Sequence, residues 1–96
     1  LLCSIVLCNF AIAVAPEKII VVDSNLRKLI EVNPTNGDRS VLSDDSIGTG
    51  PAFQNPIRLL TNANNELFVL DSGINAVFKV DIGTGNRQIV FNNNIF

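Results

Sequence analysis

The chain has 96 residues, of which 47% are hydrophobic and 17% are charged. This composition predicts one small folded domain or part of a larger one, and it excludes a second full domain, a disordered tail and a polytopic membrane protein. Seven basic and nine acidic residues leave a net charge of −2, so we expect neither nucleic acid nor an anionic membrane surface as a partner. The absence of His removes the commonest general base and metal ligand.

Residues 1–15 carry no charge and place small residues at Ala11 and Ala13. This pattern is typical of a signal peptide that is cleaved after Ala13, and it predicts a secreted or periplasmic protein. A start upstream of Leu1 would supply the missing basic residues, so we expect an N-terminal fragment. The segment is shorter than the roughly 20 apolar residues of a transmembrane helix, and no stable membrane span is expected. In the alternative interpretation, residues 11–16 and 19–22 form two strands joined by a tight turn.

The chain contains two cysteines, Cys3 and Cys8, and both lie in this apolar segment. Cleavage after Ala13 would leave a mature protein without cysteine. The sequence therefore predicts no disulfide framework and no cysteine metal site.

An internal repeat becomes visible when the chain is shifted by 48 residues, because residues 20–42 then lie over residues 68–90 without a gap. A repeat of this length is typical of solenoids and propellers, in which each unit buries its apolar face against a neighbour. The identical pairs are Val21/Val69, Asp23/Asp71, Ser24/Ser72, Val32/Val80, Gly37/Gly85 and Arg39/Arg87.

Short strands are predicted within each repeat. In the second copy they cover residues 57–61, 67–70, 76–80 and 87–91, which are rich in Val, Ile, Leu and Phe. The connecting segments are rich in Asn, Gly and Asp, which favour tight turns. About four antiparallel strands in 48 residues predict an all-β fold built from β-propeller blades.

The predicted boundaries follow from this pattern: a signal peptide over residues 1–15 and a partial propeller over residues 16–96. Within the propeller, repeat 1 covers about 19–43, a connector 44–55, and repeat 2 about 56–91. The connector is polar and rich in Gly, as expected for a blade-to-blade crossing, and it is a candidate ligand loop. A closed six-bladed ring would need about six such repeats, so the remaining blades of the same chain are expected partners. Two blades alone should be marginally stable or prone to associate.

The second repeat carries a recognisable motif. A proline-led strand (56–61) is followed by a turn, by an apolar strand ending in Asp71, by a small polar turn and by a second apolar strand ending at Asp81. This motif resembles the NHL-type repeat, and residues 19–91 as a whole resemble six-bladed propellers of the gluconolactonase and strictosidine-synthase superfamily. Arg58 and Thr61 depart from that repeat, which usually has Gly and Asp there, so no ligand role is transferred from the family.

The repeated polar residues are candidates for structural roles. We expect Asp23 and Asp71 to accept hydrogen bonds from turn backbone, with metal or substrate binding as the alternative. Gly37 and Gly85 are expected in hairpin turns. Arg39 and Arg87 suit a repeated ion pair, with residues 33 and 81 as candidate partners, and a ring of such arginines for anion recognition is the alternative. The phenylalanines are expected in the core between the blades; they are Phe53, Phe68, Phe78 and Phe91.

Nothing in the sequence identifies a catalytic centre. The Gly-rich segments lack the phosphate-binding pattern, and the serines have no His partner. We therefore predict a binding or scaffolding module for a protein or glycan partner, with no evident cofactor. The alternative, which the resemblance implies, is part of a metal-dependent lactonase-like hydrolase whose divalent metal site would lie in other blades. Whether the protein is an enzyme stays open at this point.

Overall fold

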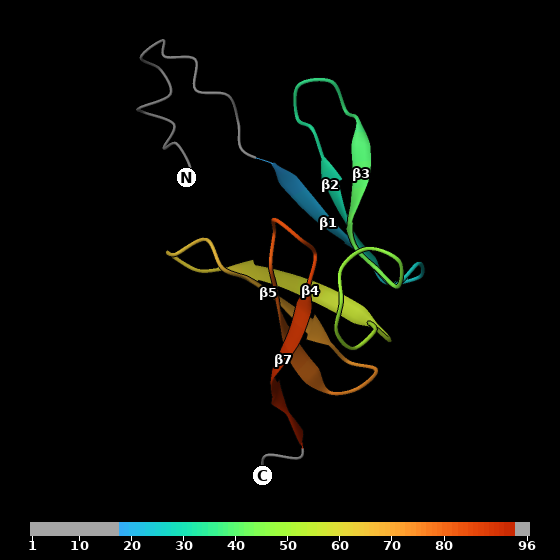
Figure 1. The fold of residues 1–96 in the computed structure, drawn as a ribbon, viewed down its shortest axis with the longest axis vertical. Coiled ribbons are helices and arrows are strands. Elements are labelled where there is room, and N and C mark those ends of the chain that lie inside the picture. The colour runs from blue at the N-terminus through green and yellow to red at the C-terminus, as the bar shows by residue number, and fades with distance from the viewer. Residues whose placement is uncertain (1–17, 94–96) are drawn as a thin grey trace.

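The computed structural model describes residues 18–93, and these form two antiparallel β-sheets without an α-helix (Figure 1). The predicted all-β class is therefore confirmed. The predicted signal peptide and both cysteines lie outside the described residues. Within the described part, no helix has the length and apolar character needed to cross a bilayer.

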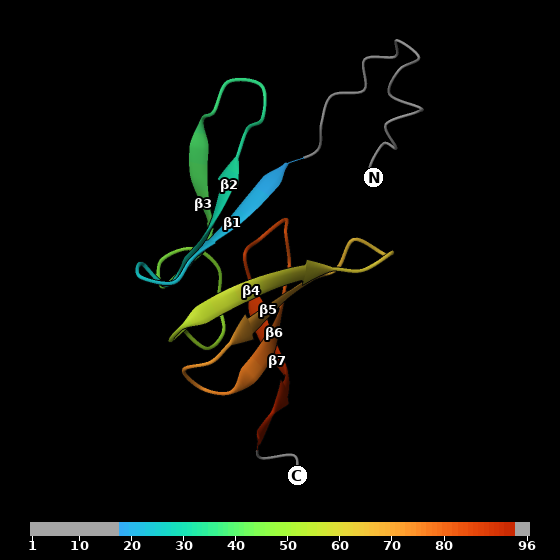
Figure 2. The same cartoon turned by 180° about the vertical axis from the view of Figure 1, so that it is seen from behind.

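The first sheet has three strands in the order β1-β2-β3, and the second has four in the order β4-β5-β6-β7. Both sheets are meanders of neighbouring strands (Figures 1 and 2). The strands are β1 (Ile19–Asp23), β2 (Lys28–Val32), β3 (Arg39–Ser43), β4 (Pro56–Thr61), β5 (Leu67–Asp71), β6 (Ala76–Val80) and β7 (Arg87–Asn92).

The two sheets repeat one another residue by residue. The pairing of β1 with β2 has the same register as that of β5 with β6 at an offset of 48, and the β-bulge at Leu29/Ile30 recurs at Val77/Phe78. Arg27 and Asn75, also 48 residues apart, both adopt positive φ in the following turn. The sequence repeat is thus a repeat of backbone structure. The residues that correspond to β4 at this offset, 8–13, lie outside the described residues.

The core lies between the sheets, which contribute opposite faces. Strand alternation puts every second side chain on one face. The core face of the first sheet consists of Ile20, Val22, Leu29 and Leu42, and the core face of the second sheet consists of Leu67, Val69, Phe78 and Val80. At equivalent strand positions, a side chain that faces the core in one sheet faces outward in the other. The two repeats therefore pack through two different faces.

The phenylalanines behave unequally. Phe53 and Phe78 are buried and contact each other edge to face, with their ring centroids 4.9 Å apart. Phe68 is half-buried, and Phe91 is 39% exposed. The prediction that Phe91 belongs to the core is wrong, because it pairs with Val77 on the opposite face of β6 from Phe78.

Candidate functional site

The most elaborate polar structure is the attachment of the connector, residues 44–55, to the second sheet. This connector leads from β3 to β4 and loops at one end of both sheets (Figure 1). Asp44 starts it with a turn, because its Oδ1 accepts hydrogen bonds from the N–H groups of Ser46 and Ile47 at 2.7 and 2.8 Å. The rest of the connector is held by side chains of β5 and β7.

Arg87, at the start of β7, is the principal anchor. Its side chain is buried with only 6% exposure, although it carries a charge. The guanidinium donates to Ser43 Oγ and to connector carbonyls, and its Cζ lies 5.5 Å from the ring centroid of Phe53. The carbonyl acceptors are those of Asp44 (2.7 Å), Ile47 (3.2 Å), Gly50 (3.1 Å) and Pro51 (2.7 Å). One planar guanidinium group with five donors thereby holds the connector backbone at four residues between Asp44 and Pro51.

These contacts differ from the ion pair expected for Arg87. Carbonyl oxygens, rather than the carboxylate of Asp81, surround the guanidinium. Asp81 instead accepts a hydrogen bond from Gly83 N within its own turn. The cause is topological: the connector arrives at Arg87 from the preceding repeat, and the spacing within one repeat cannot reveal that contact.

Asp71, at the end of β5, is the second anchor and is fully buried. Its Oδ2 accepts from Gln54 N at 2.8 Å, and its Oδ1 accepts from Asn55 N and Gly73 N, both at 2.9 Å. The last contact is the local turn bond that the sequence predicts. The other two bind the far end of the connector, so one carboxylate joins a turn to a loop 16 residues away.

Close backbone approach completes the attachment. Gly85 adopts a φ of +81°, and a Cβ at this position would overlap the carbonyl oxygen of Leu42. That glycine's own carbonyl accepts a hydrogen bond from Ser43 Oγ at 2.7 Å. Gly48 and Gly50 lie equally close to the backbone of Gly85 and Arg87. Only residues without a side chain permit this contact.

The equivalent residues of the first repeat are differently placed. Arg39 is exposed, and Asp23 accepts from Leu26 N in its own turn at 2.9 Å. Gly37 has almost the same φ as Gly85, +80°, but a Cβ there would meet nothing within 4 Å. Equivalent residues of the two repeats therefore differ in their surroundings: Arg87 is buried under the connector, whereas Arg39 is exposed.

A shallow groove also recurs in both repeats. In the second sheet it has a volume of about 550 Å³ and is lined by Glu66, Lys79 and Asp81, among others. In the first sheet a groove of about 480 Å³ lies at the equivalent position, beside Lys18 and Glu31. Both grooves are open, and both are lined by polar side chains together with a few apolar ones.

An ion pair crosses the rim of each groove with reversed polarity. Lys18 Nζ lies 3.1 Å from Glu31 Oε2, whereas Lys79 Nζ lies 2.6 Å from Glu66 Oε2. Positions 18 and 66, and likewise 31 and 79, are 48 residues apart. The pair is thus the same contact with its two charges exchanged. A search for similar residues cannot find it, but a search for opposite charges at paired positions would.

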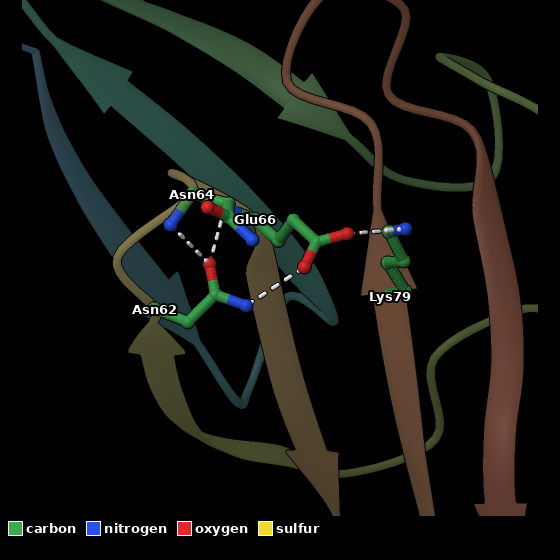
Figure 3. Close-up of polar contacts among 4 residues, drawn as sticks. All are labelled: Asn62, Asn64, Glu66 and Lys79. Carbon is green, nitrogen blue, oxygen red and sulfur yellow. Dashed lines mark hydrogen bonds and ion pairs between the residues drawn. The ribbon is translucent and has the colours of Figure 1, made fainter.

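In the second repeat, this ion pair belongs to a polar cluster around Asn62 (Figure 3). Asn62 Oδ1 accepts from the N–H groups of Asn64 and Glu66, each at 3.0 Å, and Asn62 Nδ2 donates to Glu66 Oε1 at 2.7 Å. Lys79 and Asn62 together hold the pKa of the Glu66 carboxyl below its ordinary value. Both carboxylate oxygens are engaged, so the cluster closes the β4–β5 turn.

Within residues 18–93, no three His, Cys, Asp or Glu side chains are grouped so that they could hold a metal ion. Neither protein-family models nor curated proteins nor solved structures yield a match to this chain.

Proposed function

We propose that the two sheets are consecutive blades of a β-propeller, as the resemblance of the repeat to the NHL type implies. We propose further that the chain is a binding or scaffolding module. Its partner would be a protein or a glycan, and the connector would be the contact loop. The repeated register and the packing of unlike faces support the propeller, because stacking of identical units around an axis requires two different faces on each unit.

The observation that carries the binding proposal is the fixed connector. Two buried charged side chains, Arg87 and Asp71, hold its backbone from within. Its outward side chains stay accessible, and Ile47 is 42% exposed beside the exposed Asp45. A loop whose shape is already set loses less conformational entropy when it binds, and loops on a rigid scaffold are where binding residues concentrate.

Secretion is the setting that the apolar residues 1–15 support, as a signal peptide. A glycan or extracellular protein partner would be consistent with that setting. The lactonase-like hydrolase is not favoured by any contact among the described residues and stays an alternative prediction.

Photo-crosslinking tests the binding proposal. A photoreactive residue would replace Ile47 in the connector, and a matched label would replace Ala63, which is exposed in the β4–β5 turn. We expect partner adducts from the label at position 47 and none from that at position 63, and an Asp45→Ala change should weaken glycan-array or partner signals at least several-fold. Equal labelling at the two positions, with unchanged signals in the Asp45 variant, would contradict the proposal.

A further inference from the structure

The two sheets leave two apolar surfaces that do not contribute to the core. The outer face of the first sheet is formed by Ile19, Val21, Ile30, Val32 and Val41, and the outer face of the second sheet by Leu60, Phe68, Leu70, Val77 and Val90. Among these, Ile19, Val21, Leu60, Leu70 and Val90 are between 40% and 66% exposed within the part of the chain described.

Each outer face is the repeat equivalent of a surface that is buried in the core. Val21 corresponds to Val69, which is fully buried in the core face of the second sheet. Leu70 corresponds to Val22, which packs against that core from the first sheet. The interface between the two sheets of one chain therefore joins the repeat equivalents of the two exposed outer faces. The strands that form these faces have the same register and the same bulge in both sheets.

We propose that the outer face of the first sheet docks onto the outer face of the second sheet of another copy of this chain, as the two sheets pack within one copy. The occupant follows from this interface, because a second copy offers each outer face the repeat equivalent of the apolar surface that the matching face already contacts within one copy. The exposed Arg39 lies on the docking face of the first sheet, at the place where Arg87 receives the connector.

Such an association joins unlike surfaces, so it propagates head to tail into a ring or an open chain. Self-association of this kind does not depend on the proposed binding of an outside partner. It can be tested with the purified chain alone, and its failure would leave the partner-binding proposal untouched.

Two single variants block one face each. Val21→Asp places a charge on the outer face of the first sheet, and Leu70→Asp does so on the outer face of the second; both side chains are about 40% exposed, so folding should persist, as circular dichroism can check. Leu26→Asp is the matched control, because Leu26 is an exposed apolar residue in the β1–β2 turn, away from both faces.

Sedimentation velocity then gives the result. The wild-type chain and the Leu26 control should form species larger than a dimer, each single variant should be a monomer, and an equimolar mixture of the two variants should form a dimer with one chain of each. The chain that carries both substitutions should be monomeric.

Four outcomes would overturn the proposal. A monomeric wild-type chain would mean that something other than a second copy covers these faces. Self-association of either single variant would mean that like faces pair, and association of the doubly substituted chain would place the contact elsewhere. A mixture of folded single variants that stays monomeric would exclude the head-to-tail contact itself.

Discussion

At the scale of single residues, the same amino acid should contribute differently to the free energy of unfolding in the two repeats. Arg87 is buried under the connector, whereas Arg39 is exposed at the equivalent position. A buried group whose hydrogen-bond partners are removed costs about 1–3 kcal/mol per unsatisfied group, and an exposed one costs little. Paired substitutions at equivalent positions therefore separate the effect of the connector from that of the residue type.

Arg87→Met should lower the free energy of unfolding by about 3 kcal/mol, because several connector carbonyls and Ser43 lose their donor. Arg39→Met should change it by less than about 0.5 kcal/mol. Urea unfolding of the two variants measures the difference. Equal losses of unfolding free energy in the two variants would show that the contacts of Arg87 with the connector do not stabilise the fold.

Asp71→Asn replaces one acceptor oxygen by an NH₂ group facing backbone donors, so we expect a loss of about 2 kcal/mol. Asp23→Asn should cost less than about 0.5 kcal/mol, since Asn also supports the single local turn bond. Thermal unfolding at neutral pH compares the two. A larger effect at Asp23 would be the contrary result.

Glu66 should make stability depend on pH in the acidic range. Hydrogen bonds from Lys79 and then from Asn62 lower the pKa of this carboxyl in the folded state. The native state therefore binds the proton more weakly than the unfolded chain. The contribution of Glu66 is complete above the ordinary Glu pKa and disappears as the pH falls through the lowered value.

Melting temperatures of the wild-type chain and Glu66→Gln provide the measurement. We expect the wild-type chain to melt higher at neutral pH and the difference to vanish as the pH falls below the lowered pKa of Glu66. A difference that stays constant over that range would show that the carboxylate charge has no part in the contact.

At the scale of elements, the connector determines which glycines are indispensable. Gly37 and Gly85 have the same backbone conformation, which costs an L-residue about 1–2 kcal/mol. A Cβ on Gly85 would also overlap the carbonyl oxygen of Leu42 near the end of β3, so it must displace this strand end and the connector that follows it.

Gly37→Ala should therefore lower the free energy of unfolding by about 1 kcal/mol, and Gly85→Ala by about 3 kcal/mol or more. Gly85→Ala should also speed amide exchange at Asp44 and Thr49, whose N–H groups are hydrogen-bonded within this attachment. Equal costs at the two glycines, with unchanged exchange in the connector, would mean that the close approach does not stabilise the loop.

The strands themselves could be predicted from the sequence, because apolar alternation and Asn/Gly turns are local signals. The predicted strands 76–80 and 87–91 agree with β6 and β7 to within one residue. The connector anchors could not be predicted, since Arg87 contacts residues some 36 to 44 positions earlier, and no periodicity encodes that contact. The partners of Arg87 and the exposure of Phe91 were missed for this reason: both depend on how repeats stack.

At the scale of the whole molecule, the central feature is one core shared by two repeats through unlike faces. Leu29 on β2 and Val69 on β5 are fully buried and belong to the same cluster, although they come from different sheets. Neither sheet has a second apolar layer of its own among residues 18–93. The two sheets should therefore unfold together.

Amide hydrogen exchange of Leu29→Ala tests this shared core most directly, with Ile30→Ala as the control on the outer face of the same strand. Truncation of a buried Leu costs about 3 kcal/mol, so we predict exchange more than about 100-fold faster at amides of the first sheet and equally at Val69 and Phe78 in the second. The Ile30 variant should accelerate both far less. Faster exchange confined to β1, β2 and β3 in the Leu29 variant would contradict a core that the two repeats share.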